Sequence, residues 1–369
     1  MKKILLGTTA VIALGAISTE AFAADKIKLE LGGFMRHYVG VISDDEASNT
    51  GTNNSDRAMS LSQDSNTEVY FSGSTTLDNG LTVKAQIELE GDGEEGGNST
   101  DKSFLTISSD AMGALTMGVT AHASDDFDVN APNAVGNFGY RDLDDWAQMA
   151  ANNGNNEAFT FSALRDWNGD NSAKLKYVTP TFNGVKGFAS YSAAEGSSAS
   201  DADNLDRNTT ADGSSFGIAY AGDVSGVAVK ADLSQTRLNG VNNNVHFGLS
   251  VAMSGVTVGG SYVSTKDDDG TDNLAGDGKE YDLGVAYNTG PYTVSASYSW
   301  AKNDGTTGVS GDNKDRAWRV AGSYDLGAGV ALSATYFNLK RDGEGDGATY
   351  VLGKSAQVSG VIAGIEVGF

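Results

Sequence analysis

The sequence lacks cysteine and contains only 3 prolines, and its 25 lysine and arginine residues are outnumbered by 48 aspartate and glutamate residues. The absence of cysteine excludes disulfide scaffolds, thiolate metal sites and cysteine nucleophiles. The net charge of −23 argues against a nucleic-acid partner and against an anionic membrane surface, since both are themselves negatively charged. Disorder is excluded as well, because 39% of the residues are hydrophobic.

Long apolar runs are missing too, apart from a short one near the amino terminus. Two lysines precede an apolar run over residues 4–17, and the Ala-Phe-Ala segment at 21–23 provides the small residues that a signal peptidase requires. The run is shorter than the roughly 20 residues that a membrane-spanning helix needs. We therefore expect residues 1–23 to be a cleaved signal peptide and residues 24–369 to be the mature protein.

What the sequence has in abundance is a two-residue alternation of apolar and polar side chains. In the first such segment Leu29 and Leu31 alternate with Glu30, which is the side-chain period of a β-strand. Further segments follow in pairs around tight turns such as Asp78-Asn79-Gly80, as in β-hairpins. We predict sixteen strands, at residues 27–41, 67–77, 81–90, 103–109, 114–120, 173–179, 185–191, 214–221, 227–238, 244–253, 256–264, 280–287, 292–302, 316–324, 330–340 and 361–369.

The connections alternate in length as regularly as the side chains alternate in polarity. Turns within each pair are short, whereas connections between pairs are long and polar, and the longest covers residues 121–172. This arrangement is the sequence signature of an outer-membrane β-barrel. Because only closure satisfies every backbone polar group in lipid, we predict an all-β fold: a single transmembrane 16-stranded antiparallel β-barrel domain in the outer membrane.

A secreted soluble β-sandwich or β-helix would alternate in the same way, but two features argue against it. Single charges such as Lys84, Lys174 and Arg319 fall on the polar face, where a dry core could not hold them and a water-filled lumen could. Aromatic residues gather towards the strand ends of the apolar face, as in the girdles at membrane interfaces: Tyr281, Tyr287, Tyr292, Tyr298, Trp300, Trp318, Tyr324 and Tyr336.

Several short segments carry a resemblance to a known family. Gly-Gly-Phe-Met-Arg-His-Tyr at 32–38, Lys-Leu-Lys-Tyr-Val-Thr-Pro-Thr-Phe-Asn-Gly at 174–184, the leader and the carboxy-terminal Phe369 resemble the general-diffusion porins of Gram-negative outer membranes. The resemblance covers the whole mature chain. It implies a homotrimer, a third long loop that folds into the barrel, and recognition of Phe369 by the barrel-insertion machinery. The Pro-Glu-Phe-Gly-Gly motif of enterobacterial members is absent, and the wall is rich in lysine rather than arginine.

The third loop, residues 121–172, is the predicted constriction. The resemblance to porins implies that acidic residues of this loop lie opposite a cluster of basic residues on the barrel wall. We take as candidate pore-lining residues the acids Asp125, Asp126, Asp128, Asp142, Asp144 and Asp145, and the wall bases Lys28, Arg36, Lys84, Lys174, Lys176, Lys186 and Arg319. Asp142 or Asp144 is expected to cap a short helix through Trp146. Because carboxylates lower the energy of cations in a narrow pore, we predict passive diffusion of small hydrophilic solutes and ions with a preference for cations.

Other functions remain open at this level. Asp267, Asp269 and Asp272 have the oxygen density of a Ca²⁺ site but lack the glutamate of an EF-hand, so they are either a calcium site or part of a charged external loop. No cofactor is otherwise expected. The three histidines are far apart and no Gly-x-Ser-x-Gly motif occurs, so we expect no enzyme, although a Ser-His hydrolase inside the barrel cannot be judged by spacing. The alternatives to a general porin are a substrate-specific outer-membrane channel and a closed barrel that serves as an adhesin.

Overall fold

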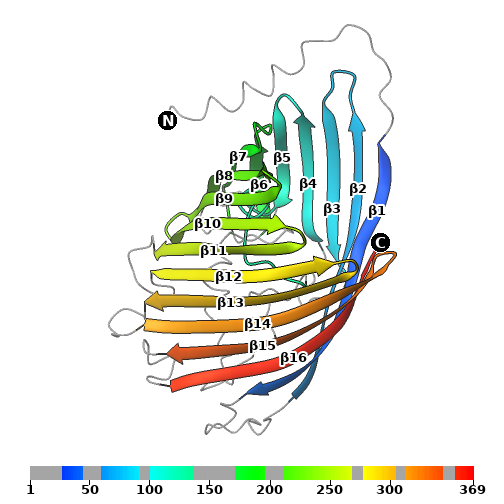
Figure 1. The fold of residues 1–369 in the computed structure, drawn as a ribbon. Coiled ribbons are helices and arrows are strands. Elements are labelled where there is room, and N and C mark those ends of the chain that lie inside the picture. Colours follow the sequence, from blue (N-terminus) through cyan, green and yellow to red (C-terminus); the bar gives the residue numbers. More distant parts are fainter. Residues whose placement is uncertain are drawn as a thin grey trace.

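The computed structural model describes residues 27–44, 60–91, 100–135, 146, 171–195, 212–267, 277–304, 312–343 and 354–369. Its strands form one closed antiparallel barrel in which the first strand lies beside the last (Figure 1). The strands are β1 (Lys28–Asp44), β2 (Ser60–Thr76), β3 (Thr82–Glu90), β4 (Thr100–Ser109), β5 (Gly113–Thr120), β6 (Ser172–Val178), β7 (Val185–Ser192), β8 (Gly213–Val224), β9 (Val227–Leu238), β10 (Asn242–Met253), β11 (Val256–Asp267), β12 (Gly278–Thr289), β13 (Tyr292–Asp304), β14 (Asp312–Gly327), β15 (Val330–Gly343) and β16 (Lys354–Gly368). The predicted 16-stranded β-barrel is therefore confirmed.

The barrel closes between β1 and β16. Arg36 lies opposite Glu366 in this register, and their side chains form an ion pair with an Nε to Oε2 distance of 2.8 Å. At the end of the seam, Gly33 and Phe369 exchange both backbone hydrogen bonds, at 3.0 and 3.1 Å. The last residue of the chain therefore takes part in closing the sheet.

The two faces of the wall differ in polarity, in the opposite sense to a soluble protein. On β12, Tyr281, Leu283 and Val285 are exposed on the outer face, whereas Glu280 and Asp282 are buried on the inner face. Other strands repeat this pattern, which suits a hydrocarbon solvent outside and a polar interior. No helix among the described residues is long and apolar enough to cross a membrane.

Aromatic residues predicted for the membrane interfaces lie on the outer face of neighbouring strands and contact one another. The ring centroids of Tyr281 and Trp300 are 5.0 Å apart, those of Tyr292 and Tyr324 are 4.8 Å apart, and those of Trp318 and Tyr336 are 5.0 Å apart. The three pairs connect β12 to β13, β13 to β14 and β14 to β15.

The short turns lie at one end of the barrel. Ser225-Gly226 and Ser254-Gly255 have positive φ at both positions, from 51° to 84°, as two-residue type I′ hairpins require. A Cβ at Gly226 would meet no atom within 4 Å, so the backbone conformation alone accounts for glycine there.

At the opposite end the strands are longer than the sequence predicts. β2 begins at Ser60 inside the loop expected at 42–66, and β16 begins at Lys354 rather than at 361. The early part of β2 contains Gln63, Asp64 and Ser65, which offer no apolar alternation. Outside lipid both faces of a strand are hydrated, so backbone pairing continues where the apolar pattern has stopped.

Candidate functional site

The connection between β5 and β6 enters the barrel and follows its inner wall. Residues 123–134 donate backbone hydrogen bonds to inward-pointing side chains on one strand after another: Ala123 N–H to Ser190 Oγ (3.0 Å) on β7, Val129 N–H to Asp232 Oδ1 (2.8 Å) on β9, Ala131 N–H to Asp282 Oδ1 (3.1 Å) on β12, and Ala134 N–H to Ser295 Oγ (2.9 Å) on β13. The inward course of the third loop is therefore confirmed for these residues.

Glycine on the inner wall allows the loop backbone to approach this closely. A Cβ at Gly248 of β10 would collide with the carbonyl oxygen of Val129, and a Cβ at Gly284 of β12 would lie 3.1 Å from the Cβ of Ala131. The wall is thus shaped to receive the loop main chain, a feature that the sequence pattern alone did not reveal.

An apolar patch on the inner wall receives the next part of the loop. Ala134, Val135 and Trp146 are buried in one cluster with side chains from the wall: Tyr38, Ile42, Ala301, Ala317, Ala321, Phe337, Leu339, Val358 and Ile362. Trp146 lies against Gly40, where a Cβ would be 2.5 Å from its ring. Sequence analysis missed this anchor. One feature of the sequence could have indicated it. β15 and β16 carry apolar residues such as Phe337 and Ile362 at inward positions, in addition to the apolar residues of their outer face.

The root of the loop is held by a buried group of charges. His122 Nε2 lies 2.7 Å from Glu195 Oε1, and Lys174 Nζ lies 3.2 Å from Glu195 Oε2. Burial lowers the pKa of His122 by more than the hydrogen bond to Glu195 raises it. Burial also raises the pKa of Glu195, but the hydrogen bond from His122 and the charge of Lys174 outweigh this effect and hold that pKa below its usual range.

A serine completes this group in the order found in hydrolase triads. Ser190 Oγ lies 2.7 Å from His122 Nδ1, so hydrogen bonds connect Ser190, His122 and Glu195. The same oxygen is also bonded to the N–H of Ala123 and to Ser215 Oγ. Ser190, His122 and Glu195 are buried, with at most 6% of each residue exposed. This arrangement ties the loop to the wall. Its serine points inward but is buried, so it is not open to a substrate in the lumen as a nucleophile must be.

A second polar group follows along the loop. Asp126 pairs with Lys176 at 2.8 Å, and His246 Nδ1 lies 2.6 Å from Asp232 Oδ2 and 3.7 Å from Asp128 Oδ1. Burial raises the pKa of Asp125 to about 8, and the nearby charges of Asp128 and Asp126 add to the effect. The structure therefore brings Asp125 and Asp126 close to the predicted wall bases Lys174 and Lys176, whereas Asp128 lies beside His246. It places Lys174 and Lys176 in buried contacts with loop or turn acids.

The inner face of β2, β3 and β4 carries a different set of charges. Glu68, Glu90 and Asp101 approach one another with carboxylate oxygens within 4.8 Å. Lys102 is bound to Glu88 at 2.9 Å and to Asp101 at 3.1 Å. The loop contacts described above all lie on β6 to β16 and on β1. The inward positions of Glu68 and Glu90 follow from strand alternation, whereas Asp101 joins them at an irregularity in the register of β3 and β4.

The remaining predicted wall bases occupy separate places: Lys28 on β1 is exposed, Lys186 on β7 is half-buried, and the other three lie on β1, β3 and β14. Lys84 on β3 is exposed, whereas Arg319 on β14 is buried and donates to Ser297 Oγ at 3.3 Å. Arg36 pairs with Glu366 and also lies over the ring of Phe34, 3.8 Å from its centroid. These three residues point to the inner face, but the structure does not bring them into one cluster.

Several predicted residues lie outside the part of the chain that the structure describes. They are residues 1–23 of the leader, the loop acids Asp142, Asp144 and Asp145, the calcium candidates Asp269 and Asp272, and the side chain of Asp267. The helix predicted through Trp146 is represented among the described residues by Trp146 alone.

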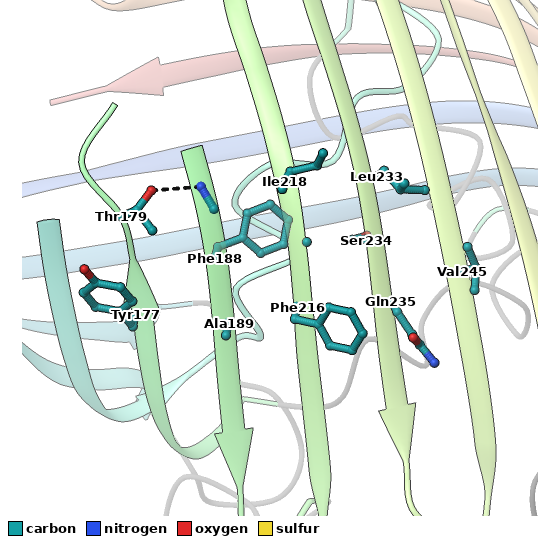
Figure 2. A pocket seen from close by; sticks show the side chains of 12 residues that line it. Tyr177, Thr179, Phe188, Ala189, Phe216, Ile218, Leu233, Ser234, Gln235 and Val245 are labelled. Carbon is teal, nitrogen blue, oxygen red and sulfur yellow. Dashed lines mark hydrogen bonds between the residues drawn. The ribbon is translucent and has the colours of Figure 1, made fainter. Parts of the chain in front are cut away.

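An apolar groove of about 590 Å³ lies on the other side of the wall, over β6 to β10 (Figure 2). Tyr177, Phe216, Ile218 and Leu233 line it, and all four are exposed on the outer face. Figure 2 shows Phe216, Leu233 and Val245 on successive strands. The groove therefore belongs to the lipid-facing surface, and the polar lumen is the candidate functional site.

Solved structures share this architecture. The chain matches OmpT, an outer membrane protein of Vibrio cholerae, with a TM-score of 0.62 and 13% identity over 95% of this chain and 100% of that one. A trimer form of the same protein matches with a TM-score of 0.62 and 13% identity over 94% of this chain and 100% of that one. A mutant of the porin of Rh. blastica matches with a TM-score of 0.56 and 16% identity over 93% of this chain and 100% of that one.

Because the sequence identities are low, the structural matches establish the fold alone. The family is established by comparing the sequence with models of protein families. No curated protein matches the sequence significantly. The family model described as Gram-negative porin matches residues 8–344, which is most of the chain. Together with the closed barrel and its inward-folded loop, this match shows that the chain belongs to the Gram-negative porin family and is a multi-pass channel protein of the outer membrane.

Proposed function

We propose that this porin allows passive diffusion of small hydrophilic solutes and ions and that it prefers cations. The observation that carries the proposal is the acidic inner face of β2, β3 and β4, which lies apart from the wall contacts of residues 122–135 and Trp146. Glu68, Glu90 and Asp101 are gathered there. Fixed carboxylates beside a narrow aqueous path attract cations and repel anions.

Among the described residues, the acids named here outnumber the lysines of this face. Lys102 is shared between Glu88 and Asp101, at 2.9 and 3.1 Å. Lys84 on β3 is exposed to solvent, where its charge is well screened. Glu68 and Glu90 lie directly opposite each other in the register of β2 and β3, so two like charges face the same space.

Reversal potentials across a KCl gradient in planar bilayers test the proposal. We expect a potential of the cation-selective sign for the unmodified protein and a clearly smaller one for the Glu68→Gln/Glu90→Gln double variant. Asp110→Asn, in the exposed turn after β4, is the matched control and should leave the potential unchanged. A chloride preference in the unmodified protein would refute the proposal. Flux that saturates with solute concentration would instead indicate a substrate-specific channel.

We extend the proposal to assembly. A homotrimer is supported by the trimer form of the Vibrio cholerae protein that this chain resembles in fold. Recognition of Phe369 by the barrel-insertion machinery is supported by its position, since its main chain pairs with Gly33 at the seam and 60% of the residue is exposed. Gel electrophoresis of unheated and heated samples tests the assembly. A trimer would migrate as a much larger species before heating and as a monomer after it.

A further inference from the structure

We propose that Asp128, Asp232 and His246 form a binding site for a divalent transition metal ion, with Zn²⁺ as the ion that the donor set fits best. The site goes beyond the proposed diffusion of solutes and does not depend on it. The three residues come from three separate elements: the inward-folded loop, β9 and β10. One ligand atom from each lies within 4.8 Å of the other two.

The distances suit a tetrahedral ion. Zn²⁺ bonds of roughly 2.0–2.1 Å to nitrogen and oxygen place neighbouring ligand atoms about 3.3 Å apart. His246 Nδ1 lies 2.6 Å from Asp232 Oδ2 and 3.7 Å from Asp128 Oδ1, which brackets this value. Small movements of two side chains would therefore complete three-point coordination, and water would supply the remaining ligand.

The donor set and its surroundings favour a cation. One imidazole and two carboxylates match the nitrogen and oxygen ligands that zinc takes in open sites. The side chains of Asp232 and His246 are 1% and 8% exposed, so water screens their charges poorly. Asp232 is further oriented by the N–H of Val129, which donates to its Oδ1 at 2.8 Å, as outer-shell partners orient metal ligands.

Two buried carboxylates face one imidazole here. The side chain of Asp128 is 9% exposed and that of Asp232 is 1% exposed. Asp126 adds a carboxylate beside Asp128, and the ion pair with Lys176 offsets its charge. A dication would offset the excess negative charge at the point where the loop crosses β9 and β10.

Isothermal titration with ZnCl₂ of the folded, EDTA-treated protein in detergent tests the site. We expect the unmodified protein to bind Zn²⁺, and we expect His246→Gln and Asp128→Asn each to weaken that binding by about tenfold or more. His37→Gln is the matched control, because His37 points outward from β1 opposite Ile365, and it should bind Zn²⁺ like the unmodified protein.

Unchanged affinity in His246→Gln, or no binding by the unmodified protein, would overturn the proposal. Heat-sensitive gel mobility reports whether each variant has folded. Should a variant fail to fold, anomalous diffraction at the zinc edge from crystals of the unmodified protein decides. A peak between the three side chains supports the site, and a peak elsewhere or none refutes it.

Discussion

Glu195 balances the charges at the root of the loop, because its two oxygens face His122 and Lys174 separately. All three side chains are almost fully buried, at 1%, 3% and 0% exposure for His122, Glu195 and Lys174. Removing one member of a buried ion pair leaves the others uncompensated, which typically costs about 3–5 kcal/mol. Glu195 is therefore one of the groups that hold His122 on the wall, together with Ser190.

We predict that Glu195→Gln lowers the thermal stability of the barrel at neutral pH. The folded-state pKa of Glu195 is lowered below its unfolded value of 4.5, so its stabilising effect is complete above pH 4.5 and is lost as the pH falls through the folded-state pKa. The difference between unmodified protein and variant should therefore shrink in acid. The measurement is the temperature at which folded gel mobility is lost, with Glu30→Gln on β1 as the control. A difference that does not change with pH would contradict the prediction.

The inward direction of single residues follows from sequence, and their partners do not. Strand alternation places Lys174 and Lys176 on the inner face, as the structure shows. Glu195 lies just after β7, in a segment without periodicity, and its meeting with His122 depends on the folding of two loops into the same space. Local pattern carries no information on such long-range contacts.

The inward-folded loop is held by its backbone as well as by its side chains, so the shape of the wall matters as much as its chemistry. Gly248 leaves room for the carbonyl of Val129, and the loop hydrogen bond to Asp232 forms beside it. Strand existence and pairing order were predictable from alternation. The docking surface was not, because glycine at an inward strand position has the same pattern whether or not another chain segment lies against it.

We predict that Gly248→Ala displaces the loop from β10 into the lumen. The added methyl would collide with the backbone of Val129, and overpacking of this kind costs about 1–3 kcal/mol. Single-channel conductance should therefore fall, because the displaced loop occupies part of the water-filled path. Gly322→Ala on β14 is the matched control, since the nearest atom to its Cβ would be 3.7 Å away. Equal conductance in the two variants would show that the loop tolerates the methyl group.

At the scale of the whole molecule, the charged groups described above lie apart from the apolar outer surface. Exposed large hydrophobic side chains cover the outside of strands from β1 to β16, whereas inward positions hold the charges of β2 to β4 and of the loop contacts. Composition alone revealed the excess of acid. The position of the acids could be assigned only from the closed barrel, because closure decides which face of each strand meets water.

We predict that cation preference weakens as salt concentration rises. The Debye length falls from about 10 Å at 0.1 M to about 3 Å at 1 M, so wall carboxylates act over a shorter distance at high salt. Reversal potentials measured at a fixed tenfold KCl ratio, but at increasing absolute concentrations, should therefore approach zero. A potential that stays constant over this range would mean that selection depends on ion size or direct binding.

The path of the loop along the wall also has a consequence for the order of assembly. Between Ala123 and Ala134 its backbone is bonded to side chains on β7, β9, β12 and β13, so its full set of acceptors exists only after those later strands have been added to the sheet. The segment precedes all of these acceptors in the chain, so it cannot form the hydrogen bonds until the later strands are in place. The last of the four bonds therefore needs β13 in place, whereas β14, β15 and β16 supply no acceptor for it.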